Sequence, residues 1–145
     1  MDKNTDAKVL NSVYRGAKVG CQAISDLMPS TNDEKFTSDL ITQEQEYEAI
    51  STEAADKLRA MGEEPQPVSF MQKAGMMMGV EMNAMMNRET DHLAELMIKG
   101  SNSGIINMTK VLNGYPNAAP EVKNLANRLI RTEQQNIERL KVYLK

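Results

Sequence analysis

EVKNLANRLIRTEQQNIERLKVYL, residues 121–144, carries the clearest structural signal in this chain. Its apolar residues recur every three or four positions, which places them on one stripe of an α-helix. One carboxylate, Glu133, interrupts this stripe near its middle. The members of the stripe are Val122, Leu125, Ala126, Leu129, Glu133, Ile137, Leu140 and Leu144. A helix with such a face must pack against other elements, so the stretch predicts a helical domain with one polar side chain, Glu133, in its interior.

Three other stretches show the same spacing, and strand-type alternation is absent. The first is predicted to be helical over residues 6–27, where Gly16 and Gly20 suggest the close approach of another helix. The second follows a capping signal and covers about residues 34–61. The third covers about residues 68–98.

Four long helices with apolar faces predict an all-α four-helix bundle, with residues 1–145 forming one domain. The first two links are too short to cross a bundle about 40 Å long, so the first three helices should alternate in direction. Glycines in residues 100–104 should end the third helix, and a short extra helix over about 105–112 should cover one end of the bundle. The alternative is that residues 99–120 run along the bundle as a crossover.

The composition fits a soluble protein, because charged residues make up 26% of the chain. The net charge of −3 argues against a nucleic-acid partner, and no apolar run reaches the roughly 20 residues that a membrane span needs. The start of the chain is polar and has no hydrophobic targeting core. Cys21 is alone and lies on an apolar stripe, which favours a buried thiol in a reducing interior. A cytoplasmic location is therefore expected.

Charge is unevenly distributed along the chain. Residues 33–64 contain ten acidic and three basic residues, whereas residues 121–145 contain three acidic and six basic residues. Two helix faces of opposite sign would attract each other if they were neighbours. The other interpretation is that the acidic segment is a docking surface for a partner.

Glu44, Glu81 and Glu133 each lie near the middle of a predicted helix, on or beside its apolar stripe. In an alternating bundle, positions near the helix midpoints lie at one level, so these carboxylates would converge. Carboxylates in a dry interior need a cation, bound protons or basic neighbours. One interpretation is a site for a single hard divalent cation. The other is a structural network with Arg15, Lys18 or Tyr47.

This arrangement resembles the ferritin-like superfamily, whose di-iron pattern places Glu on two helices and Glu-x-x-His on two others. The matching stretches here read Glu44-Gln45-Glu46-Tyr47 and Glu133-Gln134-Gln135-Asn136, so Tyr and Asn stand at the two histidine places. Glu81 stands alone on the third helix, and Ala17 stands where the first helix would need a Glu. The single histidine cannot supply two ligands, so a di-iron oxidase centre is not expected.

Glu89-Thr90-Asp91-His92 also spells Glu-x-x-His. On a helix this spacing brings Glu89 and His92 together, where they could bind zinc or iron with a residue from another helix. The alternative is a structural, hydrogen-bonded histidine.

Seven methionines lie between residues 71 and 86. Met78, Met82, Met85 and Met86 have one-turn spacing, and soft thioethers suit Cu(I). Three consecutive methionines cannot all face one core, however, and methionine also suits a plastic contact surface. A homodimer interface on this segment is therefore expected in preference to a copper site.

HLAELMIKGSNSGII (residues 92–106) and EQQNIERLK (residues 133–141) are similar to a small, uncharacterised bacterial family of ferritin-like bundles. This resemblance implies the fold and no assigned activity. The expected function is that of a non-catalytic bundle without a cofactor, which binds a protein partner or a second copy of itself. The alternative is a metal-binding protein or metalloenzyme that uses the bundle carboxylates to hold iron, manganese or zinc.

Overall fold

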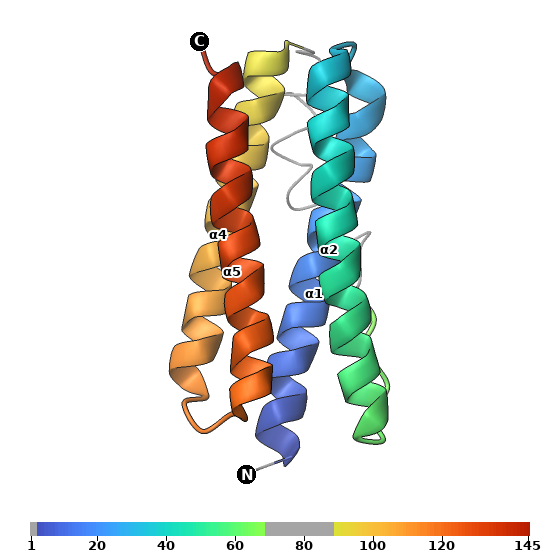
Figure 1. The fold of residues 1–145 in the computed structure, drawn as a ribbon, viewed down its shortest axis with the longest axis vertical. Coiled ribbons are helices and arrows are strands. Elements are labelled where there is room, and N and C mark those ends of the chain that lie inside the picture. Colours follow the sequence, from blue (N-terminus) through green and yellow to red (C-terminus); the bar gives the residue numbers. More distant parts are fainter. Residues whose placement is uncertain (1–2, 69–88) are drawn as a thin grey trace.

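The computed structural model describes residues 3–68 and 89–145, which form four long helices and no strand (Figure 1). The long helices are α1 (Lys3–Leu27), α2 (Glu34–Ala60), α4 (Thr90–Gly114) and α5 (Pro120–Leu140). Two short 3-10 helices are η1 (Met28–Ser30), which follows α1, and η2 (Lys141–Tyr143), which follows α5. The prediction of an all-α four-helix arrangement is confirmed for these residues.

Local signals explain where three of these helices begin and end. Pro29 lies in η1, directly after α1, as the sequence predicted. The Asp33 side chain accepts a hydrogen bond from the Phe36 backbone N–H at 2.9 Å, which caps the first turn of α2. α5 begins at Pro120, a position where the missing N–H costs nothing. The predicted ranges 6–27 and 34–61 are thus confirmed to within a few residues.

α4 corrects the prediction for residues 100–112. The chain was expected to leave the helix at the glycine-rich stretch and to form a separate short helix, but α4 continues unbroken through it. Ser101 and Met108 are both buried, so the stretch packs against the core instead of ending the helix. Most of the predicted helix over residues 68–98 lies outside the described residues.

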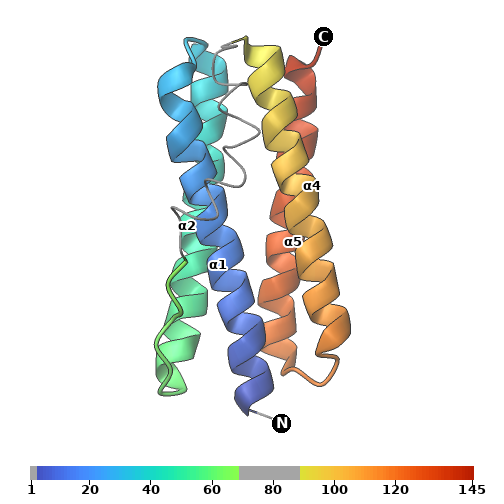
Figure 2. The same cartoon turned by 180° about the vertical axis from the view of Figure 1, so that it is seen from behind.

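Contacts at the two ends of the bundle show the direction of α4. Thr90 Oγ1 lies 3.5 Å from Asp33 Oδ2, so α2 and α4 begin at the same end of the bundle. At the other end, the Ala119 backbone N–H donates to Asp6 Oδ1 at 2.8 Å. Figures 1 and 2 show α1 and α5 running one way and α2 and α4 running the other. The predicted third helix, residues 68–98, lies mostly outside the described residues, so the expected alternation of the first three helices stays a prediction; its described part, residues 90–98, runs parallel to α2.

α2 and α4 consequently begin at one end of the bundle, and α2 ends at the other, where the connection toward α4 leads off. It starts beside α1, where Asn11 Oδ1 accepts from the Gln66 backbone N–H at 2.9 Å and Arg15 Nη1 donates to Gln66 Oε1 at 2.6 Å (Figure 2). The connection between α4 and α5 is a short turn, so the expected helical cap over one end does not form there.

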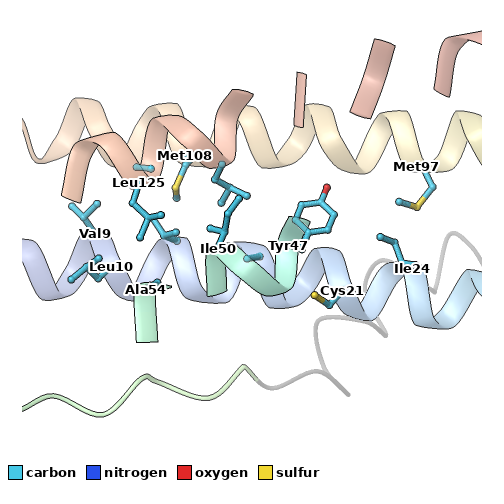
Figure 3. Packing of buried hydrophobic residues seen from close by; sticks show 14 of the residues in the cluster. Val9, Leu10, Cys21, Ile24, Tyr47, Ile50, Ala54, Met97, Met108 and Leu125 are labelled. Carbon is cyan, nitrogen blue, oxygen red and sulfur yellow. The ribbon is translucent and has the colours of Figure 1, made fainter. Parts of the chain in front are cut away.

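Apolar side chains from all four helices fill the interior (Figure 3). The largest fully buried apolar residues are Leu10, Ile24, Phe36, Leu40, Ile50, Leu58, Leu93 and Leu140. Cys21 is buried among them, as predicted, and burial together with the neighbouring Glu48 raises the pKa of its thiol to about 12. Such a thiol is a poor nucleophile.

The acidic α2 and the basic α5 are neighbours. Arg128 Nη1 lies 2.9 Å from Glu53 Oε1, and Arg139 Nη1 lies 3.0 Å from Glu46 Oε1. These pairs confirm that the two helices face each other with opposite charge. No helix in residues 3–68 and 89–145 is both long and apolar enough to cross a membrane.

Candidate functional site

Glu133 lies in the bundle interior and is paired with a tyrosine. It sits on the inner face of α5 and is 5% exposed. The Tyr47 hydroxyl, carried by α2, donates a hydrogen bond to Glu133 Oε1. Tyr47 is 2% exposed, and Figure 3 shows its ring projecting into the space between the helices. The two residues therefore join α2 to α5 through the core.

Burial controls the ionisation of both groups. It raises the pKa of Glu133 from 4.5 to about 7, although the hydroxyls of Tyr47 and Ser101 partly offset this rise by favouring the carboxylate. Burial, followed by the negative charge of Glu133, raises the pKa of Tyr47 well above its usual value. Near neutral pH the phenol is thus a fixed donor, whereas the carboxyl group is close to its titration midpoint.

Two glycines make the space for this pair. A Cβ placed at Gly104 of α4 would overlap Glu133 Oε2 and lie 3.1 Å from its Cδ. A Cβ placed at Gly20 of α1 would lie 2.7 Å from Cε2 of the Tyr47 ring. The close approach that the sequence suggested at Gly20 is therefore made by a side chain of α2. Each of the four helices contributes one residue to this arrangement.

Polar groups around the pair are only partly satisfied. Asn136 Nδ2 donates to the Tyr47 oxygen at 3.4 Å. Gln43, one turn before Tyr47 on α2, is fully buried, and neither its amide nitrogen nor its amide oxygen has a partner among the described residues. The Ser101 hydroxyl is buried close enough to influence the pKa of Glu133, yet it makes no hydrogen bond of standard geometry. Unpaired buried groups of this kind cost about 1–3 kcal/mol each.

Glu44 does not share this environment. It is partly exposed, and its Oε2 accepts a hydrogen bond from Ser25 Oγ of α1 at 3.3 Å. Gln43, the preceding residue, takes the core position instead. Glu81 lies outside the described residues. Within the described ranges, no three His, Cys, Asp or Glu side chains gather closely enough to hold a metal ion together.

The basic residues considered as partners for the glutamates point elsewhere. Arg15 binds Gln66, and Lys18 Nζ lies 3.5 Å from Glu48 Oε1. Of the three proposed partners, Tyr47 is the one that bonds Glu133.

Glu89 and His92 lie at the start of α4. Glu89 is exposed and precedes the helix with an extended backbone, at φ −66° and ψ 135°. Their spacing had suggested that both residues lie on one helix, but Glu89 precedes the helix and His92 lies within it. His92 is partly buried, and its Nε2 has no partner among the described residues. A metal role for this pair stays a prediction.

Sequence reasoning missed Gln43, Ser101 and the glycine opposite Glu133. The one available signal for Gln43 was its position, since residues 40, 43 and 47 form as good a stripe as residues 40, 44 and 47. Ser101 and Gly104 were hidden in a stretch that is typical of a loop.

The two residues at the histidine places of the ferritin-like pattern, Tyr47 and Asn136, contact each other in the core. The phenol of Tyr47 and the amide of Asn136 thus stand at the places where the ferritin-like pattern has iron-binding imidazoles. Ala17 of α1, which stands where that pattern needs a Glu, is fully buried. This set of donors does not fit a di-iron centre. No family model, curated protein or solved structure matches this chain.

Proposed function

We propose that this protein is a non-catalytic bundle of the ferritin-like type that acts by binding a protein partner or a second copy of itself. One observation carries the proposal: Tyr47 and Asn136, at the two histidine places, bond each other while Tyr47 bonds Glu133. All three side chains are buried, so they do not present an open site to a substrate. The outer faces of the helices are then the surfaces that bind the partner.

The order of the helices supports the ferritin-like part of the proposal. Ferritin-like bundles contain one long crossover connection. Here α2 ends and α4 begins at opposite ends of the bundle, while the α1–α2 and α4–α5 connections are short. Self-association through the methionine-rich residues 71–86 remains part of the proposal, although these residues lie outside the described ranges. The lone buried thiol of Cys21 supports a reducing, cytoplasmic location.

A second candidate function is the binding of a single divalent cation beside Glu133. Glu133 is buried and forms no ion pair within the described residues, and the oxygens of Gln43 and Ser101 lack partners. Hard cations prefer such oxygen ligands. Glu44 and Glu81 would have to approach Glu133 for the full predicted site to form.

Metal analysis of protein purified without a chelator separates the two candidates. We expect no stoichiometric iron, manganese or zinc in the native chain or in Glu133→Gln and Glu81→Gln variants. Stoichiometric metal that is lost in both variants would establish the second candidate instead. Sedimentation at micromolar concentration tests self-association, and a strict monomer would leave a different protein as the partner.

A further inference from the structure

A surface groove of about 440 Å³ runs between α2 and α5, on the outer side of the core. Ile50, which is almost completely buried, forms part of its apolar floor beside Ala49. Its rims are polar and include Thr42, Gln45 and Glu46 of α2 and Arg128, Arg131 and Gln135 of α5. The volume lies within the range of about 300–1,000 Å³ that is common for ligand sites.

One positive charge in this groove is not neutralised by the protein. Arg128 pairs with Glu53, and the rim carboxylate of Glu46 is already taken by Arg139. Arg131 lies one turn from Arg128, is exposed, and forms no ion pair or hydrogen bond within the described residues. The groove therefore presents one spare guanidinium between two occupied ion pairs.

Thr132 contributes a hydroxyl group to the same groove. Thr132 is 8% exposed, lines the groove, and makes no side-chain hydrogen bond within the described part of the chain. The Gln45 and Gln135 amides, one on each rim, are exposed and likewise have no side-chain partner there. The groove thus offers one cation, one hydroxyl and two amides above an apolar floor, which is the set of groups that receives a carboxylate on a short aliphatic stem.

We propose that this groove binds an acidic segment of a partner protein, with a glutamate or aspartate of that segment paired to Arg131. The proposal rests on the proposed function as a binding protein and assigns it a surface and a partner chemistry. Arginine holds carboxylates in a bidentate geometry, and the floor at Ile50 accepts an apolar neighbour of the acidic residue. Nucleic acid fits poorly, because the groove lining holds one carboxylate, Glu46, and two guanidinium groups, Arg128 and Arg131, a balance that suits a single carboxylate and not a run of phosphates.

The test is an NMR titration of the full ¹⁵N-labelled chain with a short synthetic peptide rich in glutamate and leucine. A counterpart peptide with glutamine in place of glutamate is the first control, and inorganic phosphate is the second. We expect shifts that cluster at the backbone amides of Ala49, Thr132 and Gln135 with the acidic peptide. The glutamine peptide should bind about tenfold more weakly, because it cannot form the charge-assisted pair.

Two variants and a matched control localise the binding. Arg131→Gln should weaken the acidic peptide about tenfold, and Gln135→Glu should also weaken it by adding a repelling carboxylate to the rim. Lys110→Gln makes the same charge change on an exposed site of α4 and should leave the affinity unchanged. The proposal would be overturned if Lys110→Gln weakened the acidic peptide as much as Arg131→Gln does, or if the glutamine peptide bound as tightly as the acidic one. It would also be overturned if the chemical shifts changed away from the groove or did not change at all. Binding of phosphate but not of the peptide would overturn the peptide assignment.

The same samples keep this proposal separate from the proposed function. Metal content of the native chain and of Arg131→Gln decides whether the interior is a metal site, whatever the peptide does. If the peptide does not bind and no metal is found, the groove assignment is wrong, and the protein must bind its partner through another face. If stoichiometric metal is found and is lost in Glu133→Gln and Glu81→Gln while the peptide does not bind, the proposed function and the groove assignment are both wrong.

Discussion

The carboxylate of Glu133 occupies the place where a side chain at Gly104 would lie. A Cβ at Gly104 would overlap Glu133 Oε2 and lie 3.1 Å from Cδ, so α4 presents bare backbone to a buried acid on α5. This contact explains how a helix can contain a glycine-rich stretch in its middle. The intrinsic penalty of glycine, about 1 kcal/mol relative to alanine, is offset because the missing side chain admits the carboxylate and its tyrosine donor.

Gly104→Ala should destabilise the protein, although alanine is the better helix former. The overlap forces Glu133 to move away from Tyr47, and overpacking of this kind typically costs about 1–3 kcal/mol. Gly100→Ala is the matched control, because a Cβ there meets nothing within 4 Å. It should stabilise the helix by about 0.5–1 kcal/mol. Urea unfolding of both variants measures the difference, and equal stabilisation by the two would show that the Glu133 contact is absent.

Stability should fall as the pH rises through neutrality. The pKa of Glu133 is about 7 in the folded state and near 4.5 when unfolded, so the folded state binds the extra proton between these values. Its contribution is fully present below about pH 4.5 and is lost as the pH rises through 7. A difference of about 2.5 units corresponds to about 3 kcal/mol. Denaturant unfolding between pH 4 and 8 should give a flatter profile for Glu133→Gln, and parallel profiles would contradict the assignment.

Tyr47→Phe should destabilise the protein most at high pH. The variant removes the hydroxyl that donates to Glu133, and this hydrogen bond favours the charged carboxylate. Leaving a buried carboxylate without its donor costs about 1–3 kcal/mol or more, whereas a protonated carboxyl loses less. Unfolding free energies at pH 5 and pH 8 measure the two costs. Similar losses at both values would mean that Glu133 does not change its protonation between pH 5 and pH 8.

Gln43→Met should stabilise the protein. Both polar atoms of the Gln43 side chain are buried without partners among residues 3–68 and 89–145, and methionine has nearly the same shape without the unpaired groups. Removing the penalty should raise the unfolding free energy by about 1–3 kcal/mol. Gln45→Met, on the exposed face of the same helix, should change it by less than about 0.5 kcal/mol. A loss of stability in Gln43→Met would show that the amide has a partner in solution, such as a bound ion or ordered water.

The sequence was sufficient to predict α1, α2 and α5, because each has a continuous stripe and an explicit stop or cap. It could not decide between Gln43 and Glu44, since one residue is a rotation of about 100° and both positions fit a stripe with Leu40 and Tyr47. It also favoured a break at residues 100–104, because glycine's cost is local whereas the compensating contact with Glu133 comes from a helix about thirty residues away. The direction of α4 could not be predicted for the same reason. It depends on which helix ends meet, and the single contact of Thr90 with Asp33 has no local signature.

The common starting end of α2 and α4 can be tested by a distance measurement in solution. In a Cys21→Ser background, spin labels at positions 35 and 90 should lie within about 20 Å, because Thr90 contacts Asp33. Labels at positions 35 and 110 should lie about 30 Å apart, since twenty helical residues rise about 1.5 Å each. A bundle in which α4 ran antiparallel to α2 would reverse this order by placing the start of α4 at the far end of α2. A longer distance for the first pair than for the second, measured by electron double resonance, would therefore rule out the parallel arrangement of α2 and α4 and, with it, the topological support for a ferritin-like bundle.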